Sequence, residues 1–167
     1  MKIVSNGIPK NTKRDVCKKA IEHFCSSLLS ENLFKKIHLN LIFVNDPSNR
    51  NIFASCTWED DNYRPKEFTI EIDHSLKPKE MLTALAHECV HLKQYAKGEL
   101  IDHIRQEKTR WTGSFHGKKK TYILDDEKYY WEYPWEREAR ALEMELVHKF
   151  LKYKNDKQFN KNFSLKK

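Results

Sequence analysis

Apolar and polar positions follow regular spacings along most of the chain and predict a succession of helices and strands. Between residues 12 and 30 apolar side chains recur at steps of three and four, which predicts an amphipathic helix. Residues 38–44 are almost continuously apolar and predict a buried strand, and residues 51–58 predict a second strand. In residues 67–73 apolar and polar side chains alternate, so a third strand with one buried face is expected there.

A longer helix is predicted directly after the third strand. Pro78 suits a first helical turn, Glu80 complements the positive end of the helix dipole, and Gly98 suits a left-handed C-terminal stop. Its predicted core-facing stripe consists of Leu82, Leu85, Cys89, Leu92 and Ala96.

The remaining chain predicts one more helix and an irregular region. Residues 99–128 mix charged residues with glycines and favour a hairpin or a lid, and residues 135–153 show helical spacing. We therefore expect an α+β domain, in which a small, mostly antiparallel sheet packs against three helices. The domain is predicted to span residues 1–150 and to be followed by a basic C-terminal tail, residues 151–167.

The helix after the third strand carries the sequence His-Glu-Cys-Val-His, residues 87–91. Residues four apart share a helix face, so His87 and His91 can offer two imidazoles to one metal ion. Glu88 lies next to them and can reach a water molecule bound to that metal. Two histidines with an adjacent carboxylate are the minimal set for zinc-assisted hydrolysis, in which Glu88 acts as general base. Cys89 points away from this face and is expected in the core.

A catalytic zinc ion takes three protein ligands, so a third ligand must come from another element. Pro134 suits the start of the last helix, and Glu136 lies in its first turn. Glu136, Ala139, Arg140 and Glu143 share one helix face. A small residue one turn after Glu136 would let the two helices approach closely, so Glu136 is the predicted third ligand.

Other residues compete for the third position. His116 precedes a glycine in the irregular region, and loops can deliver ligands; His103 follows closely behind as a candidate. Glu132 and Glu138 are weaker alternatives, because Glu138 faces away from Glu136 on the same helix.

Four stretches of the chain resemble the SprT-like zinc metallopeptidases of phages. The matching segments are Phe68–Asp73, Ala84–Leu100, Trp111–Gly113 and Tyr133–Ala139. The resemblance implies a compact zincin-type fold, zinc on His87 and His91, and Glu88 as general base. A glutamate in a Glu-x-x-Ala stretch as third ligand is similar to ImmA-type zincins, and Glu136 matches that position. SprT and Spartan proteins proper use a third histidine, often near a His-Gly pair, which keeps His116 as a rival.

Two further parts of a hydrolytic mechanism have candidates in the sequence. An additional donor is usually needed for the oxyanion of the tetrahedral intermediate. Tyr129, Tyr130, Tyr133 and Arg140 lie near the predicted third ligand. The strand at residues 67–73 is expected to pair with an extended peptide substrate, as in the zincins that the chain resembles.

Composition places the chain among small proteins without a membrane span. Its 167 residues fit one domain, and no stretch reaches the roughly 18 apolar residues of a transmembrane helix. The first residues have no apolar segment typical of a secretory signal. The four cysteines form no CxxC pair and are expected as free thiols in a reducing cytoplasm, the host's if the protein is viral.

The net charge of +7 is concentrated at the C-terminus, where residues 151–167 carry five of these charges. Lysines interleaved with aromatic residues are a weak sign of nucleic-acid binding. The leading hypothesis is a zinc metallopeptidase that cleaves a protein or peptide. The alternatives are a DNA-associated module that uses the basic tail, and a catalytically idle zinc-binding structural protein.

Overall fold

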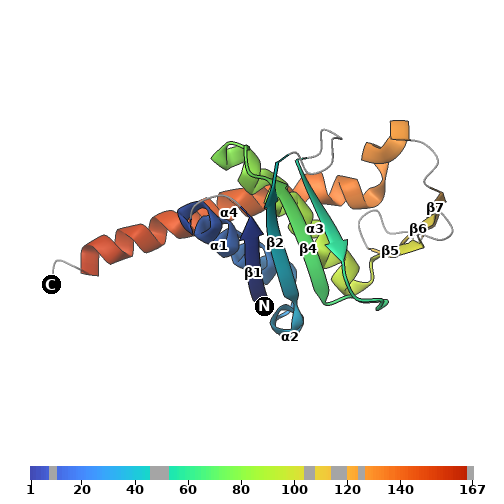
Figure 1. Ribbon diagram of the computed structural model, residues 1–167, viewed down its shortest axis with the longest axis horizontal. Coiled ribbons are helices and arrows are strands. Elements are labelled where there is room, and N and C mark those ends of the chain that lie inside the picture. The colour runs from blue at the N-terminus through green and yellow to red at the C-terminus, as the bar shows by residue number, and fades with distance from the viewer. Residues whose placement is uncertain (8–10, 46–52, 104–107, 114–119, 124–126, 165–167) are drawn as a thin grey trace.

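A four-stranded sheet forms the centre of the molecule and has the strand order β1-β2-β4-β3. The computed structural model describes residues 1–7, 11–45, 53–103, 108–113, 120–123 and 127–164 (Figure 1). The strands are β1 (Lys2–Gly7), β2 (His38–Val44), β3 (Ala54–Trp58) and β4 (Glu67–Asp73). The strands predicted at residues 38–44 and 67–73 are confirmed with the same ends. The strand predicted at 51–58 is observed from Ala54.

The central sheet is mixed, which corrects the expectation of a mostly antiparallel one. β2 pairs in parallel with both β1 and β4, and the edge strand β3 pairs antiparallel with β4. The sequence did not predict β1. This short edge strand is only partly buried, so its apolar pattern is weak. β1, helix α1 (Asn11–Leu28) and β2 form a β-α-β unit, which requires the parallel arrangement.

Three long helices lie on one side of the central sheet (Figure 1). α1 and α3 (Pro78–Lys97) contact each other, and α3 also contacts β3 and β4. α4 (Pro134–Ser164) packs across both α1 and α3. The short helix α2 (Glu31–Lys36) precedes β2. The α+β class is therefore as predicted.

The main core is formed between the sheet and α1, α3 and α4. All residues of the predicted apolar stripe of α3 lie in this core, and so do the three alternating apolar residues of β4. These buried residues are Leu82, Leu85, Cys89, Leu92 and Ala96 on α3, and Phe68, Ile70 and Ile72 on β4. The helix that carries the two histidines is thus held rigidly along one side.

Both ends of α3 are as the sequence predicts. Pro78 occupies the first turn, and the Glu80 carboxylate accepts a hydrogen bond of 3.1 Å from the backbone N–H of Lys77. At the other end Gly98 has a φ of 68°, in the left-handed region that favours glycine. Its N–H donates to the carbonyl of Tyr95 at 2.8 Å.

A second, antiparallel sheet follows α3 and includes parts of residues 99–128, for which the sequence favours a hairpin or a lid. Its strands are β5 (Leu100–His103), β6 (Lys108–Trp111) and β7 (Lys120–Ile123), in the order β5-β6-β7. This bears out the hairpin alternative for residues 99–128. A 3₁₀ helix (Glu127–Glu132) then leads into α4.

α4 is longer than the predicted helix at residues 135–153. It continues to Ser164 and includes most of the segment that was expected to be a tail. Its C-terminal half extends beyond the rest of the molecule (Figure 1). The boundary at residue 150 therefore falls within a continuous helix, although the basic character of the segment is unchanged.

Candidate metal centre

The two histidines of the motif lie together on the side of α3 that faces α4. Their Nε2 atoms are 3.1 Å apart, and the two ring centroids are separated by 4.7 Å. His91 is buried, and the His87 side chain is 16% exposed. A helix period of 3.6 residues brings residues four apart onto one face, so the local sequence alone accounts for this pairing.

Glu136 reaches the same point from the first turn of α4. Its Oε2 lies 3.2 Å from His87 Nε2, and its Oε1 lies 3.3 Å from His91 Nε2. The side chain is 1% exposed. Ala139, one turn further along α4, is fully buried and leaves room for the two helices to approach, as its size predicted.

The spacing of these three groups suits a tetrahedral zinc ion. Zinc bonds nitrogen and oxygen at about 2.0–2.1 Å, so two of its ligand atoms in a regular tetrahedron lie about 3.3 Å apart. The 3.1 Å between the two Nε2 atoms is close to that value, and each of these atoms has one oxygen of the Glu136 carboxylate at a similar distance, 3.2 Å for His87 and 3.3 Å for His91. Within the described part of the chain, His87, His91 and Glu136 form a group that could hold a metal ion.

Each histidine is oriented by a second side chain at its other ring nitrogen. His87 Nδ1 lies 2.8 Å from Glu143 Oε2, and His91 Nδ1 lies 2.8 Å from Gln94 Oε1. Such outer contacts leave Nε2 directed toward the metal position and raise the basicity of the imidazole. Sequence reasoning placed Glu143 on the face of Glu136 but assigned it no contact, and it missed the role of Gln94.

The charges at the centre favour a cation. Burial acts to lower the pKa of His87, but hydrogen bonds to Glu136 and Glu143 and nearby negative charge raise it to about 10. Burial acts to raise the pKa of Glu136, but both histidines and the nearby Tyr130 hold it well below its usual range. The carboxylate of Glu136 thus stays ionised inside the protein and requires positive charge beside it.

Glu88 lies against this group and is itself buried. Its pKa is raised above the usual value, first by burial and also by the negative charge of Glu136, while His91 and His87 act to lower it. A carboxylate with a raised pKa accepts a proton more readily near neutral pH. This property suits the general base that the sequence predicts at this position.

The rivals for the third ligand have different positions. Glu138 lies elsewhere, in a buried ion pair with Lys93 at 2.9 Å, and the Glu132 side chain is 68% exposed. His116 lies outside the described residues. The backbone of His103 ends β5, and its side chain is not among those described. Glu136 is the candidate that the described structure brings to the histidines.

Among the candidate oxyanion donors, Tyr130 is placed at the metal centre, close enough to Glu136 to lower its pKa. Tyr133 stacks on Trp135 with 4.5 Å between ring centroids. Arg140 donates a hydrogen bond to the backbone carbonyl of Trp131 and lies over its ring. The side chain of Tyr129 is not described.

Comparison of the chain with models of protein families gave no match, and the curated proteins and solved structures likewise contained no match.

The four cysteines are free thiols, as expected. Among the described helices, none is both long and apolar enough to cross a lipid bilayer.

Proposed function

We propose that this protein is a zinc-dependent metallopeptidase of the SprT-like type that acts as an endopeptidase. The observation that carries the proposal is the convergence of His87, His91 and Glu136 beside the buried carboxylate of Glu88. The residues fit a zinc ion in number, type and spacing. When bound, zinc supplies Lewis-acid activation of water and of the substrate carbonyl.

The protein residues around the metal position have separate roles in this proposal. Glu88 takes a proton from the attacking water and later gives it to the leaving amine. The hydroxyl of Tyr130, which is hydrogen-bonded to Glu136, turns to donate to the oxygen of the scissile carbonyl as negative charge develops there. Proximity of Tyr130 to Glu136 supports this assignment.

The strand that would bind an extended substrate is β3 rather than β4. β4 is paired on both sides, with β2 and with β3, so the expectation that residues 67–73 pair with a peptide is wrong. β3 is an edge of the sheet and contacts α3, the helix that carries the histidines. A peptide added alongside Ala54–Trp58 would gain main-chain hydrogen bonds without a strict sequence requirement.

The proposal is tested by a Glu88→Gln variant assayed for zinc content and for cleavage of fluorescently labelled casein. We expect the variant to retain its zinc and lose hydrolysis, because glutamine cannot accept the proton. The matched control is Glu145→Gln, which alters an exposed glutamate of α4 and should leave both properties unchanged. Cleavage by Glu88→Gln at the rate of the unaltered protein would refute the general-base role.

A second candidate, nucleic-acid binding, is favoured by the C-terminal half of α4. The basic segment beyond residue 150 continues this helix to Ser164 and extends away from the body of the molecule. A helical array of lysines can follow a phosphate backbone. Deleting residues 156–167 should abolish binding to DNA at low salt and leave peptide cleavage intact. If the full chain does not bind DNA at low salt, this candidate is wrong.

A further inference from the structure

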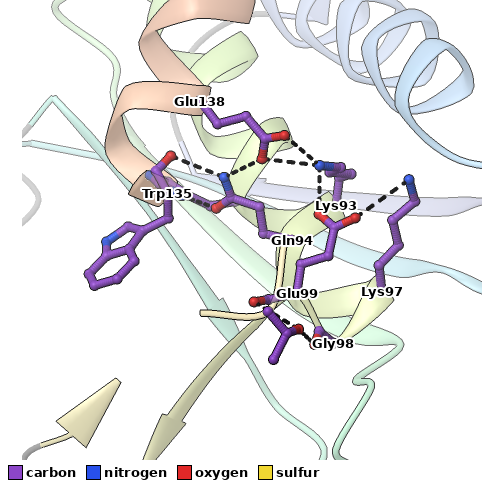
Figure 2. A network of polar contacts seen from close by, with 9 residues as sticks. Lys93, Gln94, Lys97, Gly98, Glu99, Trp135 and Glu138 are labelled. Atoms are coloured by element: carbon purple, nitrogen blue, oxygen red, sulfur yellow. Dashed lines mark hydrogen bonds and ion pairs between the residues drawn. The ribbon is translucent and has the colours of Figure 1, made fainter. Parts of the chain in front are cut away.

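The amide of Gln94 is fully buried next to His91, one helical turn before the end of α3. Its Oε1 lies 2.8 Å from His91 Nδ1, and its Nε2 donates to the carbonyl of Trp135 at 3.0 Å and to Glu138 Oε2 at 2.9 Å. Figure 2 shows the amide between α3 and the first turn of α4, directed toward both acceptors. Gln94 therefore links one histidine of the metal centre to the helix that carries Glu136.

The partners of Gln94 determine which way its amide faces. An amide has two N–H donors on one side and an acceptor oxygen on the other. Trp135 O and the Glu138 carboxylate are acceptors, so the NH₂ group must face them. The opposite orientation would place the amide oxygen against two other oxygens. Oε1 must then face His91, and a hydrogen bond there requires the proton to be on His91 Nδ1.

A proton on Nδ1 has a direct consequence for the metal centre. In a neutral imidazole one nitrogen is a donor and the other keeps its lone pair. His91 Nε2 therefore has the free lone pair, and this is the atom that lies 3.1 Å from His87 Nε2 and 3.3 Å from Glu136 Oε1. The contact with Gln94 thus selects the tautomer that can bind a metal.

A buried ion-pair network holds the amide in place (Figure 2). Glu138 accepts hydrogen bonds from Lys93 Nζ at 2.9 and 3.0 Å, and Lys93 Nζ also lies 2.6 Å from Glu99 Oε2. Lys93 and Glu138 are both buried, so solvent does not compete for these contacts. Because Glu138 is held by Lys93, it cannot readily turn away from Gln94.

We infer that Gln94 is a positioning residue for the metal: it fixes the tautomer and the ring orientation of His91 so that Nε2 points at the ion. The inference rests on the metal centre of the proposed function and does not depend on peptide hydrolysis. What matters is an acceptor at Oε1, whereas the two donor contacts only orient the amide.

Two substitutions separate this role from a general contribution to folding. Gln94→Leu removes the acceptor, and we expect the zinc affinity, measured by competition with a chromophoric chelator, to fall by about 10–100-fold. Gln94→Glu keeps an acceptor for His91 Nδ1–H but loses both donors and places a second carboxylate near Glu138. Without metal, both variants should melt at a lower temperature than the unaltered protein. Gln94→Glu should nevertheless retain its zinc affinity within about threefold, because it keeps the acceptor for His91 Nδ1–H.

The control for lowered stability is Ile70→Val, which shortens a fully buried core residue on β4. This variant should melt at a lower temperature and bind zinc as tightly as the unaltered protein. A second measurement needs no variant: NMR of the zinc-bound protein should show a slowly exchanging Nδ1 proton on His91, because its acceptor is buried.

The outcomes distinguish the inference from the metal centre itself. Unaltered zinc affinity in Gln94→Leu, or equal losses in Gln94→Leu and Gln94→Glu, would overturn the positioning role and leave the metal centre standing. An NMR spectrum with His91 Nδ1 unprotonated in the zinc-bound protein would overturn it too, even if the variants fail to fold. If the unaltered protein binds no zinc, both the centre and this inference are wrong.

Discussion

Replacing Ala139 with leucine should push α4 away from α3 and disrupt the candidate metal centre. Ala139 is fully buried on the face of α4 that it shares with Glu136 and Glu143, both of which contact His87 of α3. Leucine adds three carbon atoms to a side chain that is already fully buried, and carbon atoms in contact lie about 3.5–4.0 Å apart. The two helices must therefore separate or distort to admit the larger side chain.

The expected effect has two parts. Overpacking a core position costs about 1–3 kcal/mol, which for a protein of this size lowers the melting temperature by roughly 2–12 °C. In addition, the two oxygens of the Glu136 carboxylate lie 3.2 and 3.3 Å from the histidine nitrogens, close enough to share one ion with them. A shift of α4 by about 1 Å would lengthen these distances beyond the roughly 3.3 Å that a tetrahedral ion allows.

The assay is differential scanning fluorimetry with and without zinc, combined with a zinc titration. The matched control is Ala141→Leu, the same change at an exposed position of α4. We expect Ala139→Leu to lose both stability and zinc affinity, and Ala141→Leu to lose neither. Equal behaviour of the two variants would refute the idea that close packing at Ala139 sets the position of Glu136.

Two other predictions follow from buried charges. The pKa of His87 is raised from 6.5 to about 10, so without metal the protonated ring stabilises the fold fully below pH 6.5, and this stability is lost as the pH rises toward 10. Urea denaturation with a chelator should show this decline, and a His87→Gln variant should show a flatter profile; equal slopes would contradict the assignment. Lys93→Met leaves Glu138 and Glu99 without their buried partner and should cost about 3–5 kcal/mol in urea denaturation. Lys97→Met, whose contact with Glu99 is 3.9 Å, should cost less than about 1 kcal/mol, and similar losses in both variants would contradict the role of Lys93.

Local sequence signals predicted the elements that carry the candidate centre. Pro78 and Gly98 mark the ends of α3, and the spacing of four places His87 and His91 on one face without any tertiary contact. Glu136 could be selected because the start of α4 and the small Ala139 are both visible in the sequence. Each of these signals lies within a few residues of the feature that it predicts.

The parts that could not be predicted depend on contacts between distant segments. The partners of the histidines are one example, since Glu143 meets His87 only because α4 crosses α3 at a particular angle. The parallel pairing of β1 is another, because its short sequence has little apolar alternation and its pairing with β2 depends on the intervening α1. The position of β3 at the sheet edge, with β4 inside the sheet, likewise follows from the strand order. Local sequence patterns do not encode that order.

Zinc content, measured by mass spectrometry, decides whether His87, His91 and Glu136 hold a metal ion. The measurement compares the unaltered protein with His87→Ala, Glu136→Ala and His116→Ala, and Glu132→Ala serves as an exposed glutamate control. We expect about one zinc ion per chain, lost with His87 and Glu136 and retained in the other two variants. Zinc that survives Glu136→Ala, or is lost with His116→Ala, would contradict the His-His-Glu centre. Protein that takes up no zinc even after its addition would contradict the metal site altogether.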